Sequence, residues 1–237
     1  MAAHQSGTVA GVDDSELYPV YAFYIVVDTS SSMRQNDAID ELNHQLPRFL
    51  QGIRDDEPDV AEIARISLIE FNDEPTVNLP LMDLADVEEI RPLIAQGGTA
   101  FSPVFRLLRE VIPQHVRSLG APVYRPAIFM LSDFQAMDRR ELWERELDAL
   151  KDPSFKYHPR IVGFGFGTID QEKLKRVADP TLAYVATTTD PLAALRTALE
   201  VVRNSILRTV QHAADAGGRI EIDDAHRDFR QLEILTP

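Results

Sequence analysis

Two periodicities alternate along the chain. Val20–Val27 is continuously apolar, which is typical of a strand buried on both faces of a sheet. From about Asp37 the apolar residues recur at intervals of three and four, which predicts a helix with one apolar face. These residues are Ile39, Leu42, Leu46, Phe49, Leu50 and Ile53. The pattern therefore predicts a strand, a loop and a helix.

The same alternation continues to about residue 212. Further strands are predicted at 65–71, 127–131, 160–165 and 182–186, with a short edge strand at 76–79. Helices are predicted at 103–116, 139–150, 171–178 and from 191 to about 212. Strands separated by helices indicate right-handed crossovers between parallel strands. The predicted fold class is α/β, a doubly wound, mainly parallel sheet flanked by helices in a single Rossmann-like domain.

The two ends of the chain have a different composition. Residues 1–16 are small and polar, which predicts a disordered N-terminal segment before a domain at 17–212. Residues 213–237 form a predicted C-terminal extension. After a Gly-Gly pair it carries several large apolar residues among many charges, which favours partial docking on the domain.

Composition narrows the classes of partner. A hydrophobic content of 44% in 237 residues is enough for one domain core. The net charge of −14 argues against nucleic acid and anionic membranes, since both would repel the protein. There is no cysteine, so thiol catalysis and disulfides are excluded. The acidic start predicts no secretory signal, and the longest apolar run is too short to span a bilayer, so we expect a soluble, cytoplasmic protein.

The first predicted strand ends in a cluster of oxygen-bearing side chains. Asp28, Ser30 and Ser32 form the pattern D-x-S-x-S, at the carboxyl edge of the sheet where such folds bind ligands. One interpretation is a polar loop that caps the following helix. The other is a site for a hard cation, because three oxygens at alternate positions can face one point. The three residues alone do not decide between them.

Two later segments make the pattern more specific. "DTSSSM" resembles the metal-ion-dependent adhesion site of von Willebrand factor type A domains, which continues with a threonine loop and a strand-end aspartate. "QGGTAF" supplies Thr99, and "FMLSDFQAMD" supplies Asp133, in the expected order. The resemblance extends over residues 18–207. Within the family the chain is most similar to bacterial proteins of tellurium-resistance (Ter) gene clusters, which implies a role in stress or tellurite resistance.

The resemblance implies a metal site and a protein partner. Ser30, Ser32 and Thr99 would be hydroxyl ligands of a divalent metal, usually Mg²⁺, with Mn²⁺ and Ca²⁺ as alternatives. Asp28 and Asp133 would act mostly through coordinated waters or as groups close behind the ligands. Neutral hydroxyl ligands leave the cation under-neutralised, so an Asp or Glu carboxylate of a partner protein can complete its shell. The implied function is non-enzymatic protein binding, and the oligomeric state is left open.

The loop after Asp133 departs from the family pattern. Phe134 stands where the family usually has glycine, so we expect a different loop path and an apolar ring on the rim. Asp138 stands where related sequences often have a further aspartate. Within "DTSSS", Thr29 and Ser31 are predicted to be replaceable.

Other functions and other candidate residues were weighed against this interpretation of the sequence. A metal-assisted phosphatase or hydrolase could use the same strand-end aspartate loop, although the chain has no nucleophile elbow or Ser-x-x-Lys pair near Ser30. "GFGFG" at 163–167 lacks the spacing of a phosphate cradle and predicts close packing at a strand end. The six histidines show no zinc-type spacing, and His44 is predicted to lie on the surface.

Three acidic segments complete the list of candidates. The clusters at 54–59 and 83–89 are predicted to be solvated loops and helix starts. In the C-terminal extension, a carboxylate of Glu221, Asp223 or Asp224 could occupy the open position of the metal, in its own chain or a neighbouring one.

Overall fold

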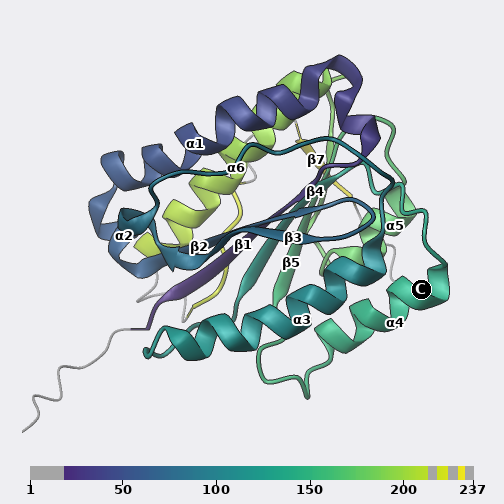
Figure 1. Ribbon diagram of the computed structural model, residues 1–237. Coiled ribbons are helices and arrows are strands. Elements are labelled where there is room, and N and C mark those ends of the chain that lie inside the picture. The colour runs from purple at the N-terminus through teal and green to yellow at the C-terminus, as the bar shows by residue number, and fades with distance from the viewer. Residues whose placement is uncertain (1–18, 213–217, 224–228, 233–237) are drawn as a thin grey trace, which may run out of the picture.

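The computed structural model describes residues 19–212, 218–223 and 229–232. The predicted disordered segment, 1–16, lies outside the described residues. A mixed sheet crosses the described part of the chain between two layers of helices (Figure 1). Its strands are β1 (Tyr21–Asp28), β2 (Ala64–Phe71), β3 (Thr76–Asp83), β4 (Ala127–Ser132), β5 (Arg160–Gly165), β6 (Ala183–Ala186) and β7 (Phe229–Gln231).

Five strands are parallel and the two edge strands are antiparallel. The order across the sheet is β3-β2-β1-β4-β5-β6-β7. β1 pairs in parallel with both β2 and β4, and β4, β5 and β6 continue the parallel part. β3 pairs antiparallel with β2, and β7 pairs antiparallel with β6. The carboxyl ends of the five parallel strands therefore lie along one edge of the sheet.

The helices cover both faces of the sheet. They are α1 (Ala38–Asp56), α2 (Pro58–Ile63), α3 (Phe101–Ser118), α4 (Arg140–Lys151), α5 (Gln171–Val177) and α6 (Pro191–Gln211), with 3-10 helices η1 (Ser31–Asp37) and η2 (Leu84–Asp86). In Figure 1, α1 and α6 lie side by side on one face, and α3 and α4 lie together on the other. This arrangement confirms the predicted doubly wound α/β class.

The position of strand β1 between two layers of helices explains why its sequence is apolar throughout. All eight residues are buried, and alternate side chains enter opposite cores. Phe23 and Ile25 pack in the core beneath α1 and α6, whereas Tyr24 and Val26 pack in the core beneath α3 and α4. A strand covered on both faces has no solvated side, so a continuous apolar run is its expected signature.

The structure extends one predicted strand and defines the helices within one acidic segment. The edge strand predicted at 76–79 extends through Thr76–Asp83, because the antiparallel pairing with β2 continues through a register shift. The acidic segment at 54–59 contains the end of α1 and the start of α2, whose first residue is Pro58. Proline is favoured there because the first helical N–H has no helical partner. The side chains of that segment are exposed or half-buried, as predicted.

Glycines bring α5 close to the sheet. A Cβ added to Gly163 would lie 2.4 Å from Leu174 Cδ1, and one added to Gly165 would lie 3.0 Å from Leu174 Cδ2. Neither distance leaves room for a side chain unless the Leu174 side chain moves. The predicted close packing of "GFGFG" at a strand end is therefore confirmed.

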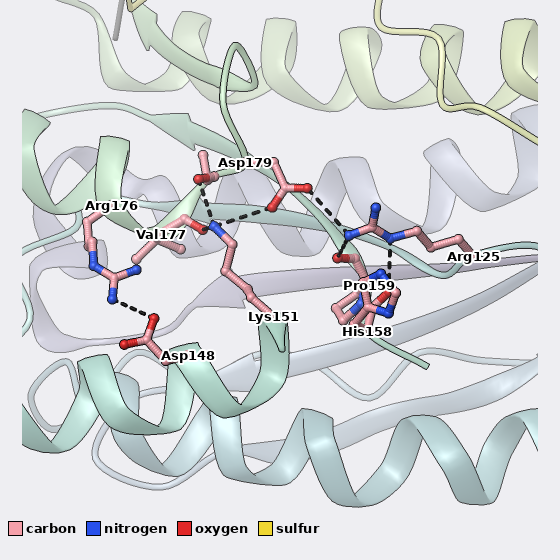
Figure 2. Close-up of polar contacts among 9 residues, drawn as sticks. Arg125, Asp148, Lys151, His158, Pro159, Arg176, Val177 and Asp179 are labelled. Atoms are coloured by element: carbon pink, nitrogen blue, oxygen red, sulfur yellow. Dashed lines mark hydrogen bonds and ion pairs between the residues drawn. The ribbon is translucent and has the colours of Figure 1, made fainter. Parts of the chain in front are cut away.

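An ion pair between the half-buried Lys151 and the buried Asp179 holds the opposite edge of the sheet, where the parallel strands begin (Figure 2). Lys151, at the end of α4, donates to the carbonyl oxygens of Val177 and Ala178 and lies 3.3 Å from an Asp179 carboxylate oxygen. Burial lowers the pKa of Lys151, and the Asp179 carboxylate opposes that shift. Arg125 donates to carbonyls just before β5 and lies near the same carboxylate. These contacts fasten α4, the end of α5 and the start of β5 together.

The described parts of the C-terminal extension dock on the domain. β7 covers the edge of β6, and Leu232 is buried. Residues 218–223 follow α6, where Glu221 N–H donates to Thr209 and Asp223 N–H donates to Ser205. The division between residues 212 and 213 as a domain boundary stays a prediction. Within the described residues, no helix has both the length and the apolar character needed to cross a membrane.

A bidentate ion pair joins the first and last long helices. Arg196 on α6 contacts both carboxylate oxygens of Glu41 on α1, at 2.6 and 3.0 Å, and Gln45 donates to the same carboxylate. Hydrogen bonding to Arg196 lowers the pKa of Glu41 to about 2. The Glu41 side chain is 11% exposed and that of Arg196 is 54% exposed, so solvent weakens the pair.

We predict that Glu41→Gln lowers the melting temperature at pH 7 by about 2 to 4 °C. The folded-state pKa lies below the unfolded value of about 4.3, so the stabilisation is present above that value and is lost as pH falls toward 2. The difference between wild type and variant should be full at pH 7 and about half as large at pH 3. Calorimetry at both pH values measures it.

Glu172→Gln is the matched control, because Glu172 pairs with Lys175 at 3.2 Å but is 86% exposed. It should change the melting temperature little at either pH. A Glu41→Gln difference of the same size at pH 7 and pH 3 would contradict the assigned role of the pair.

Candidate functional site

The candidate site begins where β1 ends. Asp28 is only 1% exposed, yet its carboxylate lies at the carboxyl edge of the sheet. One oxygen accepts the backbone N–H of Ser30 at 2.8 Å, a turn that aspartate favours two residues before the donor. The other accepts the Ser132 hydroxyl at 2.6 Å. Both oxygens therefore have partners within the site.

The electrostatics of Asp28 differ from those of an ordinary buried carboxylate. Within the described chain, none of the ion pairs includes Asp28 or Asp133. Burial raises the pKa of Asp28 to about 6, the hydrogen bonds from Ser132 and Ser30 oppose the shift, and the nearby Asp133 carboxylate adds to it. The site therefore holds negative charge without a cationic side chain.

The serine side chains connect Asp28 to Asp133. Ser30 Oγ lies 3.0 Å from Ser32 Oγ, and Ser32 donates to Asp133 Oδ2 at 3.2 Å. Ser30 is buried, Ser32 is exposed and Asp133 is half-buried, so the series of oxygens runs from the core to the surface. Four of the five predicted site residues are thus joined by hydrogen bonds.

Thr99 reaches the same place through backbone contacts. Gln96 N–H donates to Thr29 O, and Ser31 N–H donates to Gly97 O, so the two loops run side by side. Gly97 has φ of 68°, and a Cβ there would lie 2.3 Å from an Asp73 carboxylate oxygen, which explains the Gly-Gly pair. Thr99 is buried, and its carbonyl accepts Met137 N–H at 2.8 Å. The threonine loop is therefore held between the serine loop and the loop after β4.

Phe134 corrects one expectation. It has φ of 59°, the left-handed conformation that glycine adopts without strain, so the loop keeps a path that favours glycine. Its ring does not lie on the rim. It is fully buried and packs edge-on against Phe101 at 5.8 Å between ring centroids. Burial of the ring and the hydrogen bond from Phe134 N–H to Ser132 Oγ offset the strain.

Asp138 has a structural function that the sequence did not define. Its carboxylate accepts the backbone N–H groups of Phe101 and Ser102 at 3.1 and 2.8 Å. These are the first residues of α3, which has no side-chain cap of its own. Asp138 therefore caps α3 and fixes the helix that follows Thr99.

Ser132 is the site residue that the sequence reasoning missed. Its hydroxyl donates to Asp28 and accepts from Phe134 N–H, so it links the first and last segments of the site. The parallel register pairs Val27 with Leu131, which places Asp28 beside Ser132. The adjacency of β1 and β4 is the signal that could have identified it.

The burial and hydrogen bonds of Thr29 contradict the prediction that this residue is replaceable. It is fully buried, and its hydroxyl donates to Phe71 O at 3.1 Å and accepts from Asn72. Ser31, by contrast, is exposed. Thr29 positions the loop against the end of β2, whereas Ser31 is the suitable position for a control substitution.

Two carboxylates of the C-terminal extension lie elsewhere. Glu221 pairs with His212, and Asp223 pairs with Arg208, in the last part of α6. The groove that borders the predicted metal site reaches Pro191 at the start of that helix, and Arg208 lies 17 residues further on, about 25 Å away at 1.5 Å per residue. In their own chain these two groups do not reach the site. Asp224 lies outside the described residues.

The arrangement of oxygens fits a small divalent cation. Metal–oxygen distances of about 2.0 to 2.1 Å in an octahedron place adjacent ligand oxygens about 2.9 Å apart. The Ser30 and Ser32 hydroxyls, at 3.0 Å, have nearly this spacing. No group of three or more His, Asp or Glu side chains in the described residues is placed to hold a metal, so a cation here would depend on hydroxyls and water. Ser30 and Ser32 bring two such hydroxyls together, and the backbone of the Thr99 loop runs beside them.

An open groove continues from this site. It has a volume of about 650 Å³ and is lined by Ser32 and Asp133 at one end. The loops after β5 and β6 form its walls, and Gln135 ties the Asp133 loop to the β5 side by donating to Thr168 O. His44, by contrast, is exposed on α1, as predicted.

The comparison with protein families identifies one domain. Residues 23–135 match the model of the von Willebrand factor type A domain. This range is just under half of the 237 residues, and it contains all five predicted site residues. No curated protein matches the sequence closely enough to count as a relative.

Solved structures with the same fold come from distant proteins. Proximal thread matrix protein 1 from the mussel byssus, in a form with a zinc-occupied MIDAS motif, has a TM-score of 0.58 and 17% identity. That match covers 80% of this chain and 48% of the mussel chain. The pilus adhesin SpaC of Lactobacillus rhamnosus GG has a TM-score of 0.63 and 12% identity, over 81% of this chain and 30% of the adhesin.

An archaeal protein extends the comparison. The ArnB paralog VWA2 of Sulfolobus acidocaldarius has a TM-score of 0.51 and 16% identity, over 78% of this chain and 46% of that one. This chain thus spans half or less of the length of these three proteins, and at such identities the likeness concerns the fold. The chain has the fold of these structures, and its residues 23–135 match the von Willebrand factor type A domain.

Proposed function

We propose that this chain is a metal-dependent protein-binding module of the von Willebrand factor type A family, with no catalytic activity of its own. The observation that carries the proposal is the series of hydrogen bonds from Asp28 through the Ser30 N–H and the Ser30 and Ser32 hydroxyls to Asp133. The two serine hydroxyls lie 3.0 Å apart, and none of the ion pairs among the described residues includes the Asp28 or Asp133 carboxylate. Mg²⁺ is the proposed cation, with Mn²⁺ and Ca²⁺ as alternatives.

Each residue of the site has a distinct part in the proposal. Ser30, Ser32 and Thr99 would hold the cation through neutral oxygens. Asp28, set back and engaged by Ser132, would supply negative charge and orient the serine loop. Asp133, half-buried at the rim, would act through a coordinated water. The cation, when bound, supplies a coordination position for an Asp or Glu carboxylate of a partner protein.

The position of Asp28 favours binding over phosphoryl transfer. Each of its carboxylate oxygens already accepts a hydrogen bond, and the residue is only 1% exposed, so a substrate would have little access to it. The relatives of this fold include an adhesin and a byssus matrix protein, which supports an interaction role by likeness alone. A cytoplasmic location and membership of a bacterial tellurite-resistance system are proposed from the sequence resemblance only.

Metal binding is the first test. We predict that wild type binds Mg²⁺ or Mn²⁺ in isothermal titration calorimetry, that Ser32→Ala weakens binding about tenfold or more, and that Asp28→Asn abolishes it. Ser31→Ala is the matched control on the same loop and should stay within about twofold of wild type. Circular dichroism checks that each variant is folded. Equal binding by the Ser31 and Ser32 variants would reject the site.

Carboxylate binding at the cation is the second test. Acetate added to the Mn²⁺-loaded protein should displace a coordinated water and lower the relaxation rate of the solvent protons. Acetamide, which is similar in size but uncharged, should have little effect. If acetate does not change the relaxation rate although Mn²⁺ binds, the carboxylate part of the proposal is wrong.

The same preparations test the alternative function. Turnover of an aryl phosphate in the presence of Mg²⁺, lost in Asp28→Asn, would favour a phosphatase and contradict the proposed absence of catalysis.

A further inference from the structure

The groove beside the candidate metal site differs in charge from the rest of the chain. Of its fifteen lining residues, all within the described ranges, Asp133 is the only one with a charge. Charged residues make up 26% of the sequence, so about four would be expected among fifteen. The exception, Asp133, lies at the end that borders the metal site.

The rest of the lining combines hydroxyl and apolar groups. Thr187, Thr188 and Thr189, in the loop between β6 and α6, form one wall, and Thr168 and Gln171, beside β5 and α5, add polar groups to the other. Apolar side chains such as Phe166 and Ile169 lie between them. A threonine hydroxyl can both donate and accept, so such a surface suits the N–H and C=O groups of an extended backbone.

The sheet topology gives the groove a direction. Asp133 follows β4, and the two walls follow β5 and β6, which are the next strands in the sheet order. The groove therefore leads away from the metal site along the carboxyl edge. Its volume of about 650 Å³ lies within the range of ligand-binding clefts.

We propose that this groove binds an extended, uncharged peptide segment of the partner, adjacent in its sequence to the carboxylate that reaches the metal. The inference rests on the proposed function and adds the chemistry of the partner. Beyond the end at Asp133, a charged side chain laid in the groove would lose hydration without gaining an opposite charge from a lining residue, which disfavours it. The groove thereby selects for a lone carboxylate followed by small polar or apolar residues.

The proposed carboxylate is an Asp or Glu side chain, and a free C-terminus is the competing source. Two displayed peptide libraries distinguish them, one with a fixed central Asp and random flanks, the other with random residues before a free C-terminal carboxylate. Each is selected on the wild-type protein in Mg²⁺ and eluted with EDTA. Enrichment from the first library supports the proposal, and enrichment from the second library alone contradicts it.

The expected selection is directional. On one side of the carboxylate, Lys, Arg, Asp and Glu should be depleted about fivefold relative to the unselected library, and the other side should be more tolerant. If charged residues are as frequent on both sides as in the unselected library, the groove is not the docking site.

Substitution of a groove residue tests directly whether the peptide binds in the groove. Thr189→Lys puts a charge at an exposed groove position and should weaken the best enriched peptide about tenfold, with Mg²⁺ affinity unchanged within about twofold. A version of that peptide with Glu on the groove side should recover part of the loss in Thr189→Lys and bind worse to wild type. Thr76→Lys, an exposed threonine on β3 across the metal site from the groove, is the control.

These outcomes distinguish failure of the proposed metal-dependent function from failure of the proposed peptide-binding groove. Absence of Mg²⁺ binding by wild type would reject the proposed function. Normal Mg²⁺ and acetate binding, with equal effects of Thr189→Lys and Thr76→Lys on the peptide, would reject the groove alone.

Discussion

The structure of the carboxyl edge depends on one buried carboxylate. Asp28 ends the central strand with its side chain almost fully covered, and such a group is costly unless its oxygens are hydrogen-bonded and its charge is balanced. The first condition is met by Ser30 N–H and the Ser132 hydroxyl, from the two ends of the site. The second is not met by any cationic side chain in the described residues. That imbalance is the physical reason to expect a cation.

The rest of the rim is arranged around this group. Phe134 takes a left-handed conformation, which lets its N–H bond Ser132 while the ring enters the core. Asp138 caps α3 and so fixes the residue that follows the threonine loop. Thr29 fastens the serine loop to the end of β2. These contacts use backbone groups and buried side chains, leaving Ser32 and Asp133 at the surface for a ligand.

The two edges of the sheet have different roles. Lys151, Arg125 and Asp179 close the edge where the parallel strands begin, and their hydrogen bonds go mainly to carbonyls of the chain itself. At the carboxyl edge, the loops after β4, β5 and β6 leave an open groove instead. The low charge of this groove, in a chain with a net charge of −14, is the observation from which an uncharged peptide segment is proposed. The likeness to distant solved structures concerns the fold, whereas the groove is a property of these loops.

The sequence by itself determined the class of fold and the residues to examine. The apolar run of β1 and the spacing of α1 predicted both elements, because burial and helical periodicity are local patterns. The positions of Asp28, Ser30, Ser32, Thr99 and Asp133 followed from a motif, and their role as metal ligands remains a prediction. Only the tertiary structure decided where the Phe134 ring lies, since a buried and an exposed ring have the same local sequence. It also decided the partnership of Ser132 with Asp28 and the charge-poor groove, because both depend on which strands are neighbours in the sheet, and strand order is a property of the whole chain.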